Sequence, residues 1–372
     1  MKILFILDLY KPHIGGVEIL FENIISRLAS AGNDIVVLTS KYDKSLEKYE
    51  KNGNIEIYRV GNNRYDFMFY SIFTGIKLAK KCDIIHTTTY NSAIPASLIG
   101  MFSGKKVVLT VHEIFGQLWY KFMGFKGFFF KIFESLIFKF PYQKYICVSN
   151  YTKNSLRIHF GLDDSKLITI YNGIDYSFWN RDNFDIENFS QIRKDLGLEN
   201  NYVGLFYGRP GISKGLEYYI KAIPEIVKKV PEFKALLIVP HSSNNPITKI
   251  ENLIDDLKIR DNIVLIPAVS NLELPNYILV SDFVIIPSLV EGFGFAVAEV
   301  SALGQNLITT EVAAIPEVAC GNVNFVEPGN ISDIVKKVID FKNGKCTKIT
   351  KKEFRWEENI EKTLDVYKEI LK

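Results

Sequence analysis

The sequence has few cysteines, and none of them has the spacing of a metal site. The four cysteines in this chain of 372 residues are Cys82, Cys147, Cys320 and Cys346. Cys82 and Cys147 lie in or beside apolar runs, which is typical of reduced thiols in a protein core. This usage indicates a protein of the cytosol.

The sequence also lacks long hydrophobic runs, long blocks of like charge and repeats of fixed period. No stretch reaches the roughly 18 uncharged apolar residues that a membrane-spanning helix needs. The short apolar run between Met1 and Asp8 predicts a first strand, and no signal peptide is expected. The formal net charge of +3 is too small to indicate nucleic-acid binding by itself. A hydrophobic content of 47% supports real cores, and the length fits two domains of ordinary size.

Apolar, strand-like runs alternate with amphipathic, helix-like stretches, and this pattern occurs twice. Such alternation predicts an α/β fold with a parallel, doubly wound sheet, so two sets predict two Rossmann-like domains. The expected strands are Ile3–Leu7, Ile35–Leu38, Ile55–Val60, Ile84–His86, Lys106–Val111 and Tyr145–Val148, then Tyr202–Tyr207, Ala235–Val239, Ile263–Ile266, Phe283–Ile286 and Leu307–Thr309. The expected helices include Val17–Ser30, Ala93–Phe102, Lys214–Lys229, Asn245–Lys258, Phe295–Leu303 and Lys352–Lys372.

A turn and a polar stretch separate the two sets. Asn172–Asp175 has the composition of a turn, and Asn180–Asn201 is polar with weak strand character. We therefore predict a first domain over residues 1–172, a second domain over residues 173–352 and a final helix over residues 353–372.

Two carboxylates frame a glycine-containing turn. Glu291 and Glu299 are separated by seven residues, which begin Gly-Phe-Gly, and the segment links an expected strand to an expected helix. Backbone N–H groups at such a helix start suit a phosphate or diphosphate. A carboxylate beside a phosphate makes sense when the ligand also has hydroxyl groups that need acceptors, as a nucleotide-sugar does. The alternative is a buried strand and helix with two capping or surface acids.

A second glycine-rich segment opens the second strand set. The expected strand runs into Gly208-Arg209-Pro-Gly-Ile-Ser-Lys214-Gly215, and a helix is expected to start near Lys214. Arg209 and Lys214 are two cations that suit a diphosphate, whose negative charge grows as it leaves. The alternative is a solvated helix start, where lysine is a poor choice because that end of the helix dipole is positive.

Ligands of open parallel sheets bind at the carboxyl ends of the strands, which selects further candidates. Gly15 and Gly16 follow the first strand and allow close backbone approach, with Glu18 at the helix start. His112 follows the fifth strand, and His13 on the first loop is a less specific candidate. For each of these the alternative is a plain turn or a structural histidine.

Together, the Glu291–Glu299 and Gly208–Gly215 segments resemble the motifs of the retaining glycosyltransferases of family four. The resemblance implies the GT-B fold, with two Rossmann-like domains facing a central cleft and a final helix crossing back to the first domain. In the implied roles, Arg209 and Lys214 neutralise the diphosphate, and Glu291 accepts hydrogen bonds from sugar hydroxyls. The remaining implied site residues are His112 at the transferred sugar or the acceptor, Glu299 at the ribose, and Gly15, Gly16, Gly208, Phe293, Gly294 and Phe295 at the donor.

The sequence contains no Asp-x-Asp motif, which metal-dependent sugar transferases use to hold Mg²⁺ or Mn²⁺ on the diphosphate. Since side chains supply the cations here, we predict no metal and no other cofactor. The chain departs from the family at Ala313–Glu317, where Gly-Gly-x-Pro-Glu is common, and at Gln305-Asn306, where Gly-x-Pro is usual. Both departures are expected to affect loops that shape the donor pocket, so the sugar is not predicted.

The segment Leu118–Phe140 mixes aromatic residues with lysines. It contains eight phenylalanines, one tryptophan, one tyrosine and four lysines, against the single acid Glu134. An interfacial helix uses such a mixture at the surface of an anionic membrane. The alternative is a buried helix with lysines on its wet face, although the aromatics fall on too many faces for one narrow core stripe. In the family that the chain resembles, membrane-associated members use first-domain surface near this region.

These features predict a cytosolic, metal-independent retaining glycosyltransferase, peripherally bound to the inner face of the cell membrane. It would move a hexose from a UDP- or GDP-sugar, held by the second domain, to a lipid-linked or polymeric glycan acceptor on the first domain. No nucleic acid is expected as a partner. Two alternatives stay open, namely a sugar-nucleotide epimerase or sugar-phosphate-transferring enzyme on the same fold, and a non-catalytic nucleotide-sugar-binding partner subunit.

Overall fold

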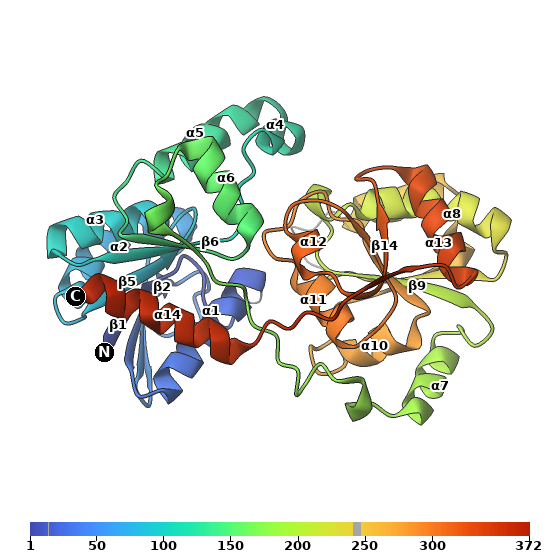
Figure 1. Cartoon of the computed structure of the whole chain (residues 1–372), viewed down its shortest axis with the longest axis horizontal. Helices are drawn as coiled ribbons and strands as arrows, with labels where there is room; N and C mark the ends of the chain where they lie inside the picture. Colours follow the sequence, from blue (N-terminus) through green and yellow to red (C-terminus); the bar gives the residue numbers. More distant parts are fainter. Residues whose placement is uncertain (14, 241–246) are drawn as a thin grey trace. The chain divides into compact units, whose positions relative to one another are not determined.

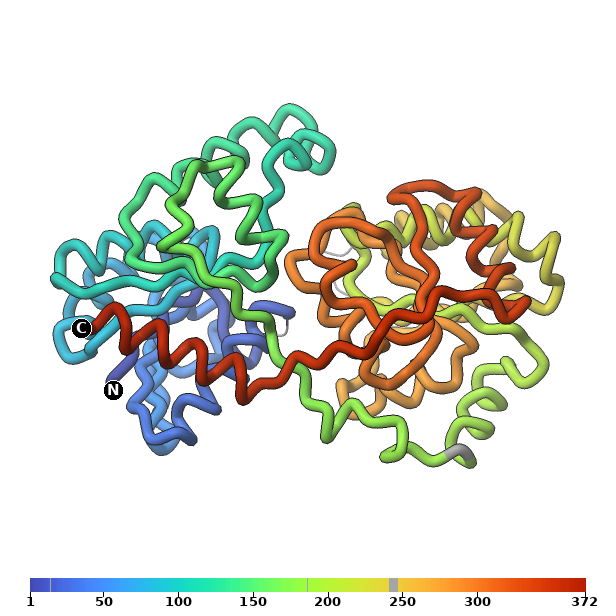
Figure 2. Tube along the Cα trace, in the orientation of Figure 1, coloured from blue at the N-terminus to red at the C-terminus, as the bar shows by residue number. Residues whose placement is uncertain are grey.

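A computed structural model describes residues 1–13, 15–240 and 247–372, with residue 186 described by its backbone alone. Contacts between residues divide the chain into two units. The first comprises Met1–Gly173 together with Phe354–Lys372, and the second comprises Ile174–Glu353. The chain therefore passes between the units twice, once before and once after the second unit (Figures 1 and 2). The assignment of the acceptor to one unit and the donor to the other stays a prediction.

The first unit contains an eight-stranded sheet with the order β3-β4-β2-β1-β5-β6-β7-β8. Its neighbouring strands are parallel except for the antiparallel pair β3–β4 at one edge. The strands are β1 (Lys2–Ile6), β2 (Asp34–Ser40), β3 (Tyr49–Asn52), β4 (Ile55–Val60), β5 (Ile84–Thr88), β6 (Val107–Val111), β7 (Lys144–Cys147) and β8 (Leu167–Thr169).

Helices cover both faces of this sheet, because successive strand residues point to opposite faces and both sets are apolar. On the face with Phe5 and His86 lie α1 (Gly16–Ser30) and α14 (Trp356–Leu371). On the other face lie α2 (Arg64–Ala79), α3 (Ala93–Ser103), α5 (Gly127–Ile137) and α6 (Asn150–Phe160). The short elements are α4 (Leu118–Met123), η1 (Gly124–Lys126) and η2 (Asp164–Lys166).

Helix α14 is fixed to the first unit by buried polar contacts. His86, in the middle of β5, is fully buried, with Nδ1 2.5 Å from the Tyr367 hydroxyl and Nε2 2.7 Å from the Thr110 hydroxyl. Burial lowers the pKa of His86 to about 3, so the ring is neutral at pH 7 and one of its nitrogens donates while the other accepts. At the start of the helix, Trp356 fills the space that a Cβ on Gly173 would occupy.

The second unit contains a seven-stranded sheet with the order β11-β10-β9-β12-β13-β14-β15, parallel except for the pair β14–β15. The strands are β9 (Tyr202–Tyr207), β10 (Phe233–Ile238), β11 (Ile263–Ile266), β12 (Phe283–Ile286), β13 (Leu307–Thr310), β14 (Gly321–Val326) and β15 (Thr347–Ile349). The helices are α7 (Ile186–Asp195), α8 (Leu216–Lys229), α9 (Ile247–Asp256), α10 (Leu274–Val280), α11 (Phe295–Ala302), α12 (Ile315–Val318) and α13 (Ile331–Lys342). The 3-10 turns are η3 (Arg181–Asn183), η4 (Ile212–Lys214) and η5 (Arg260–Asn262). The first two residues of the helix expected over Asn245–Lys258 lie outside the described residues.

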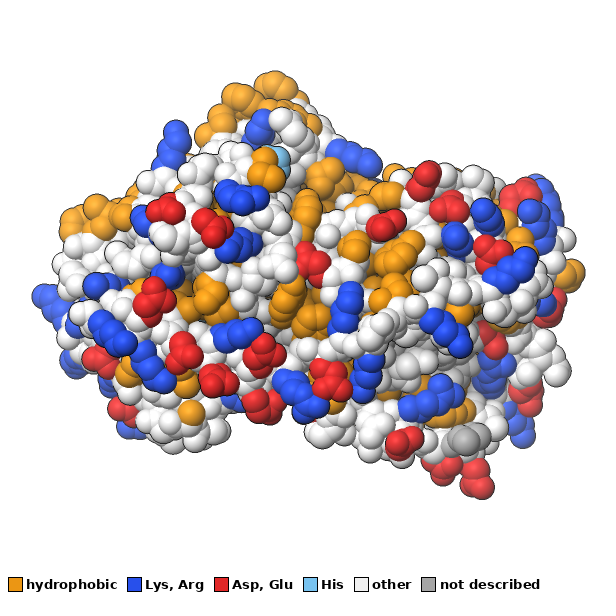
Figure 3. Space-filling model, viewed as in Figure 1, with side chains coloured by type: hydrophobic (Ala, Val, Ile, Leu, Met, Phe, Trp, Pro, Cys, Tyr) orange, Lys and Arg blue, Asp and Glu red, His pale blue; other side chains and the backbone are white. Residues whose placement is uncertain are grey.

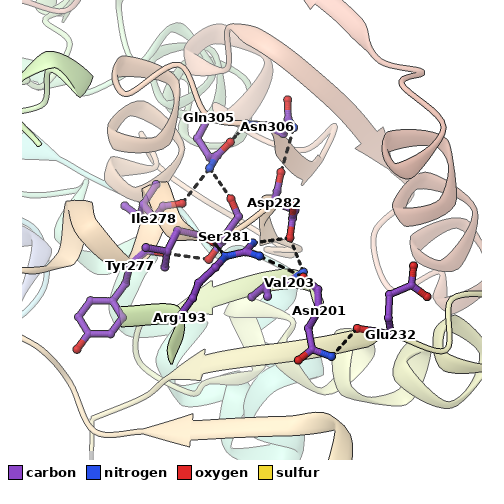
Figure 4. A network of polar contacts seen from close by, with 11 residues as sticks. Arg193, Asn201, Val203, Glu232, Tyr277, Ile278, Ser281, Asp282, Gln305 and Asn306 are labelled. Atoms are coloured by element: carbon purple, nitrogen blue, oxygen red, sulfur yellow. Dashed lines mark hydrogen bonds and ion pairs between the residues drawn. The ribbon is translucent and has the colours of Figure 1, made fainter. Parts of the chain in front are cut away.

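A polar network holds the amino ends of three strands in the second unit (Figure 4). Arg193 of α7 pairs with Asp282 (2.8 Å), whose carboxylate also accepts the backbone N–H of Val203 (2.7 Å). Gln305 donates to two carbonyl groups at the end of α10 (3.0 and 2.7 Å), and Asn306 donates to the Asp282 carbonyl (3.0 Å).

This network corrects two expectations from the sequence. The polar stretch Asn180–Asn201 contains helix α7 and its anchoring residue Arg193, so it is more than a linker. Gln305 and Asn306 precede β13 and lie at the amino ends of the strands, away from the carboxyl ends where Glu291 follows β12. The expectation that these two residues shape the donor pocket is therefore wrong, and their role is to join α10, β12 and β13.

Candidate active site

The strand order of each sheet reverses between two neighbouring strands. This reversal occurs between β1 and β5 in the first unit and between β9 and β12 in the second. The loops that follow two such strands lead in opposite directions, and open parallel sheets bind ligands at this position. Residues after β9 and β12 are therefore placed to bind a common ligand.

Lys214 and Glu291 meet at the reversal in the second unit. Lys214, at the end of η4, places its Nζ 2.6 Å from Glu291 Oε1. The Glu291 side chain is buried, and the same oxygen accepts a hydrogen bond from the Ser288 hydroxyl (2.8 Å). Lys214 is still 38% exposed, so it can be reached by a ligand. The pair forms a fixed site with one negative and one accessible positive charge.

Backbone geometry brings these two loops together. Gly215 has a φ of +68°, and a Cβ at this position would overlap the carbonyl oxygen of Pro287. The Leu289 N–H also donates to the Ser213 carbonyl (2.7 Å), which joins the loop after β12 to the loop after β9. Helix α8 begins at Leu216, slightly later than the predicted start near Lys214, so this lysine precedes the helix rather than occupying its first turn.

Glu299 lies in the second turn of α11, as the sequence predicts. Its Oε2 is 2.9 Å from the hydroxyl of Tyr207, the last residue of β9. The carboxyl group is enclosed although the whole side chain is only half-buried, and this burial raises the pKa of Glu299 to about 7. The Tyr207 hydrogen bond acts in the opposite direction, since it favours the carboxylate. Glu299 therefore changes protonation near neutral pH.

The other predicted donor residues lie on the same two loops. Gly208 follows β9 with a φ of +132°, and Arg209 after it is exposed. Phe293 is buried, with its ring centroid 5.4 Å from that of Phe295. Gly294, with a φ of +90°, precedes the first residue of α11, Phe295. The second unit thus brings its eight predicted residues to the loops after β9 and β12 and to the first two turns of α11.

The remaining predicted residues lie in the first unit. His112 follows β6, its ring is enclosed, and its Nε2 is buried without a hydrogen-bond partner. Burial lowers the pKa of His112 to about 4, so the ring is neutral at pH 7. A ligand hydroxyl could supply the hydrogen-bond partner that this buried ring nitrogen lacks. Gly15 and Gly16 begin α1, where Gly15 is extended (φ −169°).

His13 has a contact of its own. Its Nδ1 lies 3.0 Å from Glu18 Oε1, and its ring packs edge-on against Tyr42. Glu18, the acid predicted at the start of α1, is therefore in contact with His13, the less specific of the two histidine candidates.

Helix α5 supports the loop that follows His112. Glu134 is buried in α5 and accepts hydrogen bonds from the backbone N–H groups of Phe115 (2.9 Å) and Gly116 (2.8 Å). It also accepts one from the hydroxyl of Tyr90 (3.1 Å). Tyr90 follows β5 with a φ of +73°, a conformation that is costly for a residue other than glycine and is often found at functional sites. A single carboxylate thus holds the loops after β5 and β6.

Comparison with known proteins decides the family. Residues 14–178 match Glycosyltransferase Family 4, and residues 188–363 match Glycosyl transferases group 1, so the two matches span nearly the whole chain. The chain is a family-four glycosyltransferase. Its two doubly wound sheets confirm the predicted GT-B fold, and the predicted enzyme class is confirmed as well.

Two relatives and one solved structure are similar to this glycosyltransferase over its length. It is 26% identical to an uncharacterised glycosyltransferase of Methanocaldococcus jannaschii, covering 99% of this chain and 98% of the relative. It is 24% identical to the gpi3 subunit of the phosphatidylinositol N-acetylglucosaminyltransferase of Schizosaccharomyces pombe, covering 98% and 79%. The Anabaena protein HepE in complex with UDP-glucose has the same fold, with a TM-score of 0.79, 17% identity and coverage of 99% and 100%.

The glycosyltransferase also places at its strand ends polar residues that the sequence analysis did not select. Asp8 follows β1 and Asn91 follows β5, and the Asn91 amide donates to Asp8 Oδ2 (3.0 Å). Arg64 Nε donates to the same oxygen (2.8 Å). In the second unit, Tyr207 and Ser288 contact the two predicted acids. The rule that selected His112 would have found these residues had it been applied at every strand end.

The segment Leu118–Phe140 forms an exposed aromatic surface, here named the α4–α5 surface. Phe125 is 83% exposed, Phe129 62% and Ile132 50%, whereas Gly127, Glu134 and Ile137 are the buried residues of α5. Figure 3 shows hydrophobic side chains gathered over these helices at the top of the first unit. The buried-helix alternative is therefore wrong for most of the segment. No helix in the described ranges has both the length and the hydropathy needed to cross a bilayer.

Residues 1–13, 15–185, 187–240 and 247–372 contain no group of three or more His, Cys, Asp and Glu side chains arranged to hold a metal ion. Metal independence stays a prediction, because a donor diphosphate can itself contribute ligands to an ion.

Proposed function

We propose that this glycosyltransferase transfers a hexose from a nucleotide-diphosphate sugar with retention of anomeric configuration and without a metal ion. The observation that carries the proposal is the arrangement around the β9–β12 reversal. There Lys214 and Arg209 supply positive charge, while Glu291 and Glu299 supply carboxylate oxygens that can accept hydrogen bonds from hydroxyl groups. A nucleotide-diphosphate sugar has the groups that match both kinds of side chain, because its diphosphate is anionic and its sugar and ribose carry hydroxyl groups.

In the proposed reaction, the bond between the sugar C1 and the β-phosphate oxygen breaks. The acceptor hydroxyl bonds to C1 on the same face, and its proton passes to the departing phosphate. Lys214 and Arg209 stabilise the charge that develops on the diphosphate. Glu291, already held by Lys214 and Ser288, orients the sugar through its hydroxyl groups. Neutral His112 contributes its unpaired Nε2 to a hydroxyl of the sugar or the acceptor.

UDP- and GDP-sugars are the proposed donor class. The Anabaena structure with the same fold was solved with UDP-glucose, which favours testing uridine nucleotides first. A thermal-shift screen of UDP-, GDP- and ADP-sugars tests donor binding without an acceptor. We expect one nucleotide class to raise the melting temperature of the wild-type protein, and Glu291→Ala to abolish the shift while remaining folded. If no nucleotide-sugar shifts the wild-type protein, the proposal fails.

Product analysis then separates the proposal from its alternatives. Incubation with the bound donor and a glycan acceptor is expected to yield a glycoside with the donor's anomeric configuration. Epimerised or hydrolysed donor without transfer would instead support a different enzyme on the same fold. Donor binding with no turnover on any acceptor or partner protein would support a non-catalytic subunit.

The acceptor is proposed to be lipid-linked or a glycan, with the α4–α5 surface in peripheral contact with an anionic membrane at the inner face of the cell membrane. The S. pombe relative is named as a subunit of a phosphatidylinositol N-acetylglucosaminyltransferase, which supports a lipid acceptor. In the α4–α5 surface, Lys131 lies 5.4 Å from the Tyr120 ring centroid, so cations and rings share one surface. Interfacial segments combine the two in this way.

Replacing Lys121, Lys126 and Lys131 with glutamine tests this contact. Each lysine near an anionic surface is worth roughly 1 kcal/mol. The triple variant should therefore bind anionic vesicles much more weakly than the wild type and bind neutral vesicles equally. Unchanged co-sedimentation with anionic vesicles at low salt would contradict the proposed contact.

A further inference from the structure

Helix α2 carries four of its five aromatic side chains on its outer face. Phe67, Ser71 and Ala79 are buried, and Gly75 packs so closely that a Cβ would overlap Ile99 of α3. A helix on a soluble domain ordinarily directs its large apolar residues to the core, as Phe67 does here, and presents polar residues to solvent. The outer face of α2 carries Tyr65, Phe69, Tyr70 and Phe73, which are 74%, 71%, 61% and 74% exposed.

These rings form one stripe along the helix. Tyr65, Phe69 and Phe73 follow each other at intervals of four residues, so their side chains line one side of α2 over about 12 Å. Tyr70 lies beside them. Helix α3 packs against α2 and adds Met101 and Phe102, which are 58% and 67% exposed. Figure 3 shows this second gathering of hydrophobic side chains at the left edge of the first unit, over α3. Exposed apolar side chains that gather in one patch, rather than singly, mark interaction sites.

Lysines continue the stripe. Lys77 stands four residues after Phe73, and Lys80 and Lys81 follow at the end of the helix, all three exposed. Asp66 is the single acid between residues 64 and 81, and it accepts the backbone N–H of Asn62. A partner of this stripe therefore has to be both apolar and anionic. A second copy of the chain does not fit this requirement, since a symmetric dimer would bring two such lysine clusters to one interface.

The stripe lies in the same helical layer as the α4–α5 surface. Helices α2, α3 and α5 all pack on the sheet face that contains Leu4 and Leu109. The Ser97 hydroxyl of α3 donates to the Pro141 carbonyl just after α5 (3.0 Å), which joins α3 to the end of the lysine- and phenylalanine-rich segment. An anionic bilayer is apolar and negatively charged, and it extends far enough to meet both patches at once.

We propose that the outer face of α2 and α3 is a second membrane-contact site, at which Tyr65, Phe69, Tyr70 and Phe73 enter an anionic bilayer and Lys77, Lys80 and Lys81 meet its headgroups. This inference rests on the proposed function only in that the acceptor is presented at a membrane. Two contacts on one helical layer restrict rotation of the first unit on the bilayer, whereas a single contact leaves it free to turn.

The proposal is tested by co-sedimentation with vesicles of phosphatidylcholine alone and of phosphatidylcholine with phosphatidylglycerol. The test variant carries Phe69→Ser, Tyr70→Ser and Phe73→Ser. The matched control is Leu272→Ser in the second unit, since Leu272 is as exposed as Phe73 but lies outside the stripe. We expect the triple variant to keep the wild-type melting temperature and donor-induced thermal shift, and to lose at least fivefold in binding to anionic vesicles. The control should bind as the wild type does.

A second measurement does not depend on a loss of binding. Phe73→Trp should place an indole in the acyl region, so vesicles with brominated acyl chains should quench its fluorescence beyond the quenching of the native tryptophans. Leu272→Trp should add no such quenching. Three results would overturn the inference: undiminished vesicle binding by the triple serine variant, absence of extra quenching in Phe73→Trp, or a wild-type dimer that the serine variant converts to monomer. A protein that binds vesicles through α2 but shows no donor shift would instead refute the proposed function alone.

Discussion

Donor binding should depend on pH through Glu299. Its raised pKa of about 7 belongs to the protein without ligand and is caused chiefly by burial. The proposed ribose contact requires the carboxylate, because ribose hydroxyls donate their protons to it. A carboxyl group with a pKa near 7 is about nine-tenths ionised at pH 8 and about one-tenth ionised at pH 6. Affinity for a nucleotide-sugar should therefore rise with pH through neutrality and level off above it.

The magnitude follows from these populations. If the complex holds Glu299 ionised across this range, the dissociation constant should be about tenfold larger at pH 6 than at pH 8, which corresponds to about 1.4 kcal/mol. Isothermal titration calorimetry at pH 6, 7 and 8, in buffers of different ionisation enthalpy, measures both the affinity and the protons released. The probe has to be the intact nucleotide-sugar, since the terminal phosphate of a free nucleoside diphosphate itself titrates, as phosphate monoesters do near pH 6.

Two variants identify the titrating group. Glu299→Gln should bind more weakly at pH 8 and lose the pH dependence, because an amide does not ionise. Tyr207→Phe removes a hydrogen bond that favours the carboxylate, so the midpoint of the pH profile should move upward. Equal wild-type affinity at pH 6 and pH 8, or the same slope in Glu299→Gln, would refute the reasoning.

Further outcomes follow from the other contacts. Arg209→Ala and Lys214→Ala should each lower the rate of sugar transfer by about 10² to 10³ while leaving the protein folded. Near-normal turnover in both variants would contradict their proposed role in neutralising the diphosphate. Transfer should persist in excess EDTA; loss that Mg²⁺ or Mn²⁺ restores would contradict the metal-independent reaction. Ala313→Gly should not lower the melting temperature, because Ala313 has a φ of +50° and glycine relieves about 1 kcal/mol of backbone strain, which the larger chain entropy of glycine in the unfolded state partly offsets. The control Ala314→Gly should lower the melting temperature, because Ala314 is buried and has an unstrained φ of −82°. Glu134→Gln should raise the acceptor KM severalfold and leave the donor-induced thermal shift unchanged. If the variant loses the donor-induced shift as well, the defect is general and does not concern the acceptor loop.

Much of the fold could be predicted from the sequence, because buried parallel strands are continuous apolar runs. The expected strands and helices are present, and three of the four unpredicted strands in the described residues, β3, β8 and β15, are short strands at sheet edges. Strand β3 (Tyr49–Asn52) is fully exposed, so its sequence has no apolar run, and β15 (Thr347–Ile349) is similarly polar. Helix α7 was missed because it is held by the polar contacts of Arg193 rather than by an apolar face.

The placement of Lys214, Glu291 and Glu299 after β9 and β12 could be predicted, because a motif fixes both residue type and position; their roles toward a donor stay predictions. Their mutual geometry could not be predicted. The Lys214–Glu291 ion pair joins residues 77 apart in the chain, and it depends on the packing of Gly215 against Pro287. Sequence periodicity also could not show that α2 exposes Tyr65, Phe69 and Phe73, since a helical pattern does not say which of its faces meets the sheet.

The position of α14 has a consequence for how the chain folds during synthesis. This helix follows the whole second unit in the sequence, yet its Tyr367 completes a buried polar contact with His86 of β5. The second unit therefore leaves the ribosome before the first unit has its last helix. Until then, His86 Nδ1 lacks the Tyr367 hydroxyl that is its hydrogen-bond partner, and one face of the first sheet is open to water. We expect a nascent or truncated chain that ends before Trp356 to be a substrate for chaperones even though every strand of both sheets has already been made.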